Sequence, residues 1–253
     1  MVKVNVYGLD GTAKEKVDLP DVFQTLYRPD LIRKSFNALH SNKRQPYGTD
    51  PFAGTKHATA SIGKGRGMSR VPRLTQGRSA ALAPCVVGGR RAHPPKSDRN
   101  WTEKINKKEK IFAKKSAIAA TLNKELVVNR GHKFNDKISL PIVIDDKFEK
   151  INKTKDIIEL FKKIGIYEDI IRANNGKHIR AGKGKRRGRK YKIPKSILII
   201  LKNNNVMQSA NNLLGVDIVN GDDLNIGHLA PGGVAGRLTI ITKSALEQIG
   251  GIK

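Results

Sequence analysis

Residues 197–201 read Ile-Leu-Ile-Ile-Leu, an aliphatic run with no polar interruption. A half-buried strand alternates apolar and polar residues, whereas a continuous apolar strand is typical of a sheet that is covered on both faces. Residues 140–144, Leu-Pro-Ile-Val-Ile, repeat the pattern, and residues 216–219 and 238–241 are shorter runs with one polar residue each. These segments predict the buried strands of a mostly parallel sheet.

Helix-forming segments lie between these strands. Candidate helices cover residues 155–164, 167–173, 206–214 and 244–249, and Gly165 and Gly215 stand where two of them would end. Strands that alternate with helices indicate an α/β domain with helices on the faces of the sheet. The predicted fold class is therefore a single three-layer α/β domain with a mostly parallel central sheet.

The N-terminal half adds a hairpin and two helices. Residues 2–7 alternate in the manner of a strand, and residues 15–19 can return beside them. Arg28-Pro29-Asp30 opens a helix, with Pro in its first turn and Asp at its positive dipole end. A further helix is expected from about Trp101, ending at Asn129-Arg130-Gly131.

Residues 51–97 interrupt this pattern, because they contain no Asp or Glu and keep no apolar period. At roughly 47 residues the segment is far longer than an ordinary connection, so it is either disordered alone or ordered by a binding partner. We predict one globular domain made of residues 1–50 and 98–253, with residues 51–97 inserted after its first helix as a long basic loop.

The charge of the chain indicates a polyanionic partner. The 253 residues carry a formal net charge of +27, and the excess is concentrated in blocks rather than mixed evenly. A second block, residues 177–192, has nine Lys or Arg among sixteen residues and no acid. Because a helix or strand made of it would repel itself, we expect an irregular surface segment that clamps phosphates.

Other features bear on location. Cys85 is the single cysteine, which excludes an internal disulfide and fits a reducing compartment. No run approaches the roughly 20 apolar residues of a membrane span, so no membrane partner is predicted. We expect a cytoplasmic protein.

No catalytic, metal or cofactor site is predicted. Gly63-Lys64-Gly65-Arg66-Gly67 has closely spaced glycines, but a dinucleotide loop needs a preceding strand, a following helix and an acidic residue about 20 positions later. Here Val71-Pro72 blocks a helix, and no acidic residue follows the glycines until Asp98. The six histidines are dispersed, with no four-ligand zinc cluster. The acidic pairs Asp145-Asp146 and Asp222-Asp223 read as turn or helix-start residues.

Folded RNA suits these segments better than duplex DNA, whose grooves admit a helix or a paired ribbon. Arginine can hold two phosphate oxygens or stack on a base. Trp101, Tyr47, Phe52 and Tyr191 flank the basic blocks and could stack on bases, although packing against the domain is the commoner role. The candidate RNA-binding residues are Arg44, Lys56, Lys64, Arg66, Arg70, Arg73, Arg78, Arg90, Arg91, Lys96, Lys107, Lys108, Lys114, Lys183, Lys185, Arg186, Arg187, Arg189 and Lys190.

Several motifs together resemble one family. They are Arg28-Pro29-Asp30-Leu31-Ile32, Asn42-Lys43-Arg44-Gln45-Pro46-Tyr47, Gly63-Lys64-Gly65-Arg66, Arg70-Val71-Pro72-Arg73, residues 88–95 (Gly-Gly-Arg-Arg-Ala-His-Pro-Pro), residues 229–233 (Leu-Ala-Pro-Gly-Gly) and Gly236-Arg237-Leu238-Thr239. In this order they are similar to the large-subunit ribosomal protein L-four family, in the type shared by archaea and eukaryotes. The short C-terminus favours the archaeal form.

The resemblance implies a structural constituent of the large ribosomal subunit, a monomer within the ribosome that binds large-subunit rRNA and neighbouring ribosomal proteins. In this family the long loop reaches the polypeptide exit tunnel, so the nascent polypeptide is an implied partner. The residues that match the tunnel-lining segment lie within 65–78; they are Gly65, Arg66, Gly67, Met68, Arg70 and Arg73. Residues 79–88 correspond to a variable part of the loop.

Two alternatives stay open. Some members of the family outside archaea bind their own messenger, so the chain could be an RNA-binding autoregulator of its synthesis. The other is an enzyme with a dinucleotide site, which the missing acidic residue disfavours.

Overall fold

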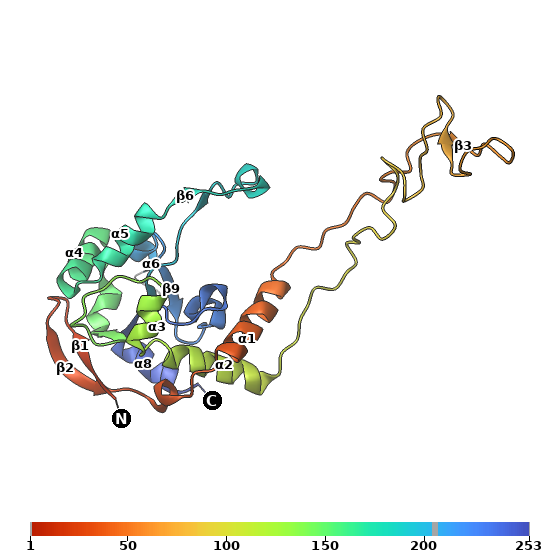
Figure 1. Cartoon of the computed structure of the whole chain (residues 1–253). Helices are drawn as coiled ribbons and strands as arrows, with labels where there is room; N and C mark the ends of the chain where they lie inside the picture. The colour runs from red at the N-terminus through yellow and green to blue at the C-terminus, as the bar shows by residue number, and fades with distance from the viewer. Residues whose placement is uncertain (1, 204–206, 253) are drawn as a thin grey trace. The chain divides into compact units, whose positions relative to one another are not determined.

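The computed structural model describes residues 2–203 and 207–252. Its main sheet has six strands in the order β2-β1-β5-β10-β8-β9 (Figure 1). The strands are β1 Lys3–Tyr7, β2 Ala13–Asp18, β5 Ile142–Ile144, β8 Leu198–Leu201, β9 Asp217–Asn220 and β10 Thr239–Thr242. All neighbouring pairs from β1 to β9 are parallel, and β2 is antiparallel to β1 at the edge. The predicted α/β class, mostly parallel sheet and N-terminal hairpin are confirmed.

Helices and short strands make up the rest of the described structure. The α-helices are α1 Pro29–Asn42, α2 Lys107–Ala119, α3 Lys124–Asn129, α4 Thr154–Ile164, α5 Tyr167–Asn175, α6 Met207–Ala210, α7 Ile226–Leu229 and α8 Lys243–Gly250. The 3-10 helices are η1 Asp21–Gln24, η2 Asp146–Lys150, η3 Lys183–Arg186 and η5 Pro231–Gly233. Two-residue strands are β3 Thr59–Ala60, β4 Arg73–Leu74, β6 His178–Ile179 and β7 Tyr191–Lys192.

The apolar strands divide their side chains between two cores. Leu198 and Ile200 face a cluster that includes side chains of α1, α2, α7 and α8, whereas Ile199 and Leu201 face a cluster that includes side chains of α4, α5 and α6. This division follows from the period of two along a strand. Full burial of one such aliphatic side chain stabilises the fold by about 1.5–3 kcal/mol, so the continuous runs fix the centre of the sheet.

Helix α4 shows why the sequence pattern worked. Ile157, Leu160, Phe161 and Ile164 fall on one face and are buried. Gly165 ends the helix at φ 90°, in the left-handed region that glycine adopts most readily. For the helix predicted at residues 206–214, the structure describes α6 only as Met207–Ala210, and position 206 lies outside the described residues.

The single helix predicted from Trp101 to Gly131 is wrong. The chain forms α2 and α3 instead, with a turn between them. The cause is Asn123, whose side-chain oxygen accepts hydrogen bonds from the backbone N–H groups of Glu125 and Leu126 and so caps a new helix. Leu122 and Leu126 keep an apolar spacing across the break, which is why periodicity alone missed it.

The second basic block also differs from its prediction. We expected no strand there, but β6 pairs with β7 through His178↔Lys192 and Ile179↔Tyr191, and η3 lies in the turn. The resulting hairpin projects from the domain in Figure 1, in teal. Strands β6 and β7 have only two residues each, and all four are exposed. The cations of the hairpin therefore lie in solvent, where water and salt screen their mutual repulsion.

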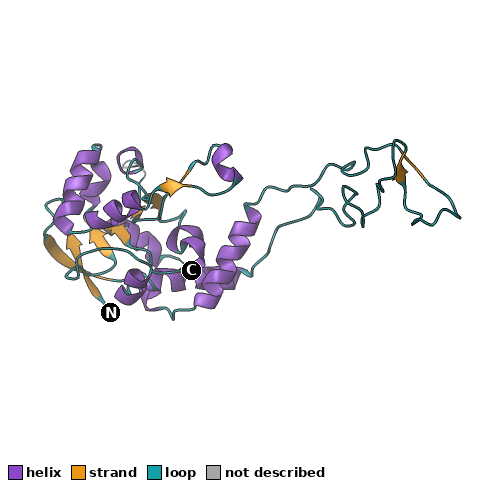
Figure 2. Ribbon diagram, turned by 45° about the horizontal axis from the view of Figure 1, so that its top comes forward, coloured by secondary structure: helices purple, strands orange, loops and turns teal. Residues whose placement is uncertain are grey.

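The chain separates into two compact units. One contains the residues up to His40 and those from Lys104 onward, including the whole main sheet; the other is Ser41–Glu103. Figure 2 draws the second unit almost entirely as loop. Its regular structure is the pair β3 and β4, extended by a bridge between Arg73 and Ala80.

Candidate nucleic-acid interface

The predicted cationic residues are mostly accessible. Only Arg73 and Lys114 are half-buried, and the other candidates are exposed. They fall into three groups: residues 44–96 of the second unit, the exposed start of α2, and the β6–β7 hairpin with its turn. Accessibility makes these side chains available to an anion, and contact with RNA stays a prediction.

The candidates within the second unit differ in what holds them. Lys56 pairs with Asp50 at 2.5 Å. Arg73 donates hydrogen bonds to the Arg78 backbone oxygen at 2.6 Å and to the Ser69 hydroxyl at 3.2 Å. Arg73 therefore braces the turn after β4 with its own guanidinium group, an internal role that the sequence did not reveal.

A cavity of about 680 Å³ brings several of these residues together. Arg66, Met68, Arg73 and Arg78 contribute to its lining, with Ile62 and Leu74 among the apolar members. Gly65 and Gly67, which flank Arg66 in sequence, adopt positive φ values of 79° and 65° that favour glycine. A wall that combines guanidinium groups and apolar side chains can contact both phosphate and base surfaces. Of the predicted tunnel-lining residues, Arg66, Met68 and Arg73 line this cavity.

Lys114 is the weakest candidate on α2. Burial lowers the pKa of its ammonium group, Asp222 raises it, and Lys110 lowers it further. Its side chain is only partly accessible, whereas Lys107 and Lys108 are exposed. Of the three RNA-binding candidates predicted on α2, two are therefore accessible.

The base of the basic hairpin is fixed by a buried carboxylate. Asp169 on α5 accepts hydrogen bonds from the Ser196 hydroxyl at 2.6 Å and from Arg172 at 2.8 Å, and lies 3.0 Å from His132 Nδ1. Arg172 also donates to the Lys195 backbone oxygen at 2.8 Å. The chain that leaves the hairpin is therefore tied back to α5, the helix that precedes it.

These contacts perturb two pKa values. Burial by itself would raise the pKa of Asp169, but His132, Arg172 and Ser196 hold it well below its usual value. Burial lowers the pKa of His132 despite the nearby carboxylate. Its Nε2 atom is buried and has no hydrogen-bond partner among the described residues. The network therefore holds an ionised Asp169 beside a histidine whose neutral form is favoured.

Arg237, before β10, is fully buried and satisfied internally. It donates to the backbone oxygens of Ser196 at 2.8 Å and His228 at 2.9 Å, and pairs with Asp217 at 2.7 Å. Burial lowers the pKa of Arg237, and Asp217 opposes that shift. This arginine ties together the amino-terminal ends of β8, β9 and β10, so the motif Gly236-Arg237-Leu238-Thr239 has a structural role here.

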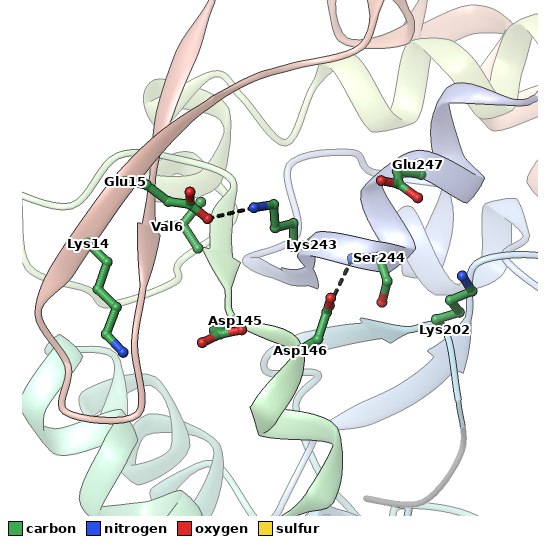
Figure 3. A pocket seen from close by; sticks show the side chains of 9 residues that line it. All are labelled: Val6, Lys14, Glu15, Asp145, Asp146, Lys202, Lys243, Ser244 and Glu247. Atoms are coloured by element: carbon green, nitrogen blue, oxygen red, sulfur yellow. Dashed lines mark hydrogen bonds and ion pairs between the residues drawn. The ribbon is translucent and has the colours of Figure 1, made fainter.

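The carboxyl-terminal ends of the strands, opposite the ends that Arg237 joins, are where α/β proteins commonly bind ligands. After β5 the chain continues to η2 and α4 on one face, and after the adjacent β10 it continues to α8 on the other. Such a divergence forms a crevice at the carboxyl ends of the strands. A pocket of about 450 Å³ lies there, lined by Val6, Lys14, Glu15, Asp145, Asp146, Lys202, Lys243, Ser244 and Glu247 (Figure 3).

The chain's own carboxylates occupy the anion positions of this crevice. Asp146 accepts a hydrogen bond from the Ser244 backbone N–H at 2.8 Å, at the N-terminus of α8 where a phosphate would bind. Lys243 pairs with Glu15 at 2.7 Å, and Figure 3 shows both contacts. A nucleotide would meet these acids, which argues against a dinucleotide enzyme.

The described residues contain no group of three or more His, Cys, Asp or Glu side chains that could hold a metal ion. In that same part of the chain, no helix combines the length and apolar character needed to cross a membrane.

Sequence reasoning missed Arg99 and misjudged some aromatic residues. Arg99 lies over the Trp101 ring at 4.3 Å from its centroid, and Arg44 lies over it at 3.8 Å. Packing explains the half-buried Trp101, but Tyr47 and Phe52 are 60% and 66% exposed, so packing is wrong for them. The signal for Arg99 was its place two residues before the only tryptophan.

An α/β domain with a mostly parallel sheet, a ligand crevice occupied by its own acids, and exposed cations in residues 51–97 and in the β6–β7 hairpin has the features of an RNA-binding protein rather than an enzyme. The chain belongs to the ribosomal protein L4/L1 family, whose model matches residues 17–252. The resemblance seen in the sequence is thereby confirmed.

Archaeal relatives match over nearly the whole length. "Large ribosomal subunit protein uL4" of Methanocaldococcus jannaschii is 53% identical over 249 residues, covering 98% of each chain. Proteins of the same name from Thermoplasma acidophilum and Archaeoglobus fulgidus are 48% and 49% identical, covering 98% of this chain and 97% and 98% of theirs.

Proposed function

We propose that this chain is a structural, non-enzymatic constituent of the large ribosomal subunit that binds and stabilises large-subunit rRNA in the cytoplasm. The observation that carries the proposal is the sequence identity of 53% and 48%, over nearly the whole chain, to proteins named as large-subunit components. Residues 51–97 and the β6–β7 hairpin carry exposed cations and contain no Asp or Glu, so these cations can bind phosphates. Its partners are rRNA and neighbouring large-subunit proteins.

The mechanism is charge neutralisation between crowded RNA helices. Each Lys or Arg that meets a phosphate releases condensed counterions, so binding weakens as salt concentration rises. The buried strands and the arginine network at their amino-terminal ends keep the domain folded without RNA. Residues 51–97 contain no acid of their own, and among the described residues Lys56, which pairs with Asp50, is the one cation of this segment in a salt bridge. The domain thus acts as a scaffold, and the long loop inserted after α1 penetrates the RNA.

The loop also lines the polypeptide exit tunnel in this proposal. Arg66, Met68 and Arg73 share one cavity, and Met68 is 41% exposed, which leaves a soft apolar contact for a passing chain. The nascent polypeptide is therefore a transient partner, and the protein is a monomer within the ribosome.

Binding and tunnel location need separate experiments. Filter binding to large-subunit rRNA should give an affinity that falls steeply between 50 and 200 mM salt, by about 10³-fold for six phosphate contacts. An affinity that salt leaves unchanged would refute neutralisation. A photo-cross-linker placed at position 68 in assembled ribosomes should capture stalled nascent chains, and one at position 153 just before α4 should not. Capture from both positions, or from neither, would refute the tunnel assignment.

A further inference from the structure

The base of the long loop is a defined structure in which two chain segments lie side by side. We call residues 41–49 and 95–103 the loop base. The Ser41 hydroxyl donates to the Trp101 backbone oxygen at 2.5 Å, and the Thr49 backbone N–H donates to the Pro95 oxygen at 3.1 Å. A Cβ atom on Gly48 would lie 2.8 Å from the Ser97 nitrogen, so the two segments touch there.

Two guanidinium groups converge on one indole ring in the loop base. Their Cζ atoms lie 3.8 Å (Arg44) and 4.3 Å (Arg99) from the centroid of Trp101. Each is attracted to the ring, but the two cations repel each other. Among the described residues neither forms an ion pair with a carboxylate, although Asp98 is adjacent in sequence.

The indole adds an unsatisfied donor to this cluster. Trp101 Nε1 is shielded from solvent and has no hydrogen-bond partner among the described residues. A buried donor without an acceptor is unfavourable. The cluster therefore combines two uncompensated positive charges with one N–H group that lacks an acceptor, and a single anion with several oxygens would relieve both.

We propose that Arg44, Arg99 and Trp101 form a binding site for one RNA backbone phosphate at the loop base. A guanidinium group that lies over a ring keeps its N–H donors at its own edge, where a phosphate can take two of them. Because guanidinium groups already lie over the indole, a phosphate fits the site better than a stacked base. The site rests on the proposed RNA-binding function and adds to it a fixed point where the loop enters the RNA.

A phosphate bound here would set register rather than sequence specificity. Phosphate contacts position a protein on nucleic acid without reading its bases. Held at its base, the loop would enter the RNA at a defined place, and its tip would reach a defined depth. This gives Arg99 a role that no sequence motif had assigned.

The single tryptophan makes the site measurable in the full-length chain. We would titrate the protein with transcribed large-subunit rRNA and follow both Trp101 fluorescence and filter retention. The proposal predicts a saturable fluorescence change with the same midpoint as retention. The double substitution Arg44→Gln/Arg99→Gln should weaken rRNA binding about tenfold and reduce the salt slope by about one, as expected when one phosphate is no longer neutralised.

Two further variants separate the explanations. Lys153→Gln/Lys155→Gln removes the same charge from exposed positions at the start of α4 and should change affinity less than twofold. Arg44→Lys/Arg99→Lys keeps the charge but loses the planar fork, so it should recover only part of the affinity. Ethylation interference on the rRNA should show one short set of phosphates whose modification weakens the wild type but not the glutamine variant.

Each contrary result has its own meaning. If rRNA binds but Trp101 fluorescence stays constant, or the glutamine variant binds like the α4 control, the phosphate site is refuted and RNA binding stands. Strong quenching without phosphate interference would show a stacked base and also refute it. Absence of any rRNA binding by the wild type would refute the proposed function itself.

Discussion

Arg237 in the domain and Arg66 in the second unit carry the same guanidinium group in opposite settings. Arg237 is 0% exposed, and its donors meet Asp217 and the backbone oxygens of neighbouring strands. Arg66 is exposed, and residues 51–97 contain no Asp or Glu to pair with it. Arginine therefore stabilises the fold of the domain through internal contacts, whereas Arg66 in the loop remains available to an external anion.

The largest effect should come from breaking the internal arginine. Arg237→Met leaves the Asp217 carboxylate without its buried partner. It also removes the guanidinium donors from four backbone oxygens, those of Ser196, Ile197, Gly215 and His228. Loss of one partner of a buried pair costs about 3–5 kcal/mol. Urea denaturation followed by circular dichroism should show that loss, while Arg66→Met should melt like the wild type. Equal stability of the two variants would show that Arg237 stabilises the fold no more than Arg66 does.

Asp169→Asn tests the second internal network. The substitution keeps the size of the side chain but removes the charge that holds Arg172, His132 and Ser196. A hydrogen bond to a charged group contributes about 1.5–3 kcal/mol, so we expect a loss of about 3 kcal/mol in the free energy of unfolding. Amides of the β6–β7 hairpin should also exchange faster, because Arg172 would release Lys195. Unchanged exchange would show that the network does not position the hairpin.

The external arginines should affect binding and leave folding unchanged. Arg66→Gln/Arg70→Gln/Arg78→Gln should lower rRNA affinity by about 10- to 100-fold and make the salt dependence shallower by about one for each phosphate that the variant no longer binds. Its melting temperature should equal that of the wild type. The charge-matched control is Lys150→Gln/Lys153→Gln/Lys155→Gln near and on α4, and equal affinity losses would mean that only net charge matters.

Acid should weaken the domain through His132. Its pKa is lower in the folded state, so the unfolded chain takes up a proton first, near its ordinary value of about 6.5. The contribution of this group is present above that pH and is lost as pH falls below it. Asp169, whose folded pKa is also lowered, loses its contribution only below about 3.9. The free energy of unfolding should therefore fall between pH 7 and 5, and in His132→Phe it should change less over that range.

The smallest effect should follow the largest deletion. Removing residues 49–96 and joining Gly48 to Ser97 with a short Gly linker takes away most of the second unit, whose base is already closed there. The buried strands and helices lie outside the deletion, so cooperative melting should persist at an unchanged temperature. A calorimetric trace without a cooperative transition would show that the domain depends on the loop.

The sequence predicted the parts whose burial is continuous. Residues 197–201 and 140–144 have no polar position to obscure their pattern, and both supply central strands, β8 and β5. Helix α4 was predictable because its apolar face and Gly165 agree. Where a single side chain redirects the backbone, as Asn123 does before α3, periodicity carried no warning.

The site was predictable by charge but not by geometry. Blocks of Lys and Arg identified the exposed candidates, but could not separate Arg73, which braces its own turn, from Arg66, which has no acid nearby. Nor could they show that the 177–192 block pairs as a hairpin, because backbone hydrogen bonds between β6 and β7 outweigh repulsion that solvent screens. Arg99 required the contact with Trp101, which joins residues to a ring through space.

The most direct test of these two uses of arginine is amide hydrogen exchange in the free protein and in assembled large subunits. Amides of β5, β8 and β10 should be protected in both states, because the domain is held together internally. Amides of residues 51–97 should exchange rapidly in the free protein and become protected in the subunit. Equal exchange of residues 51–97 in both states would contradict the proposal that this loop is held by RNA.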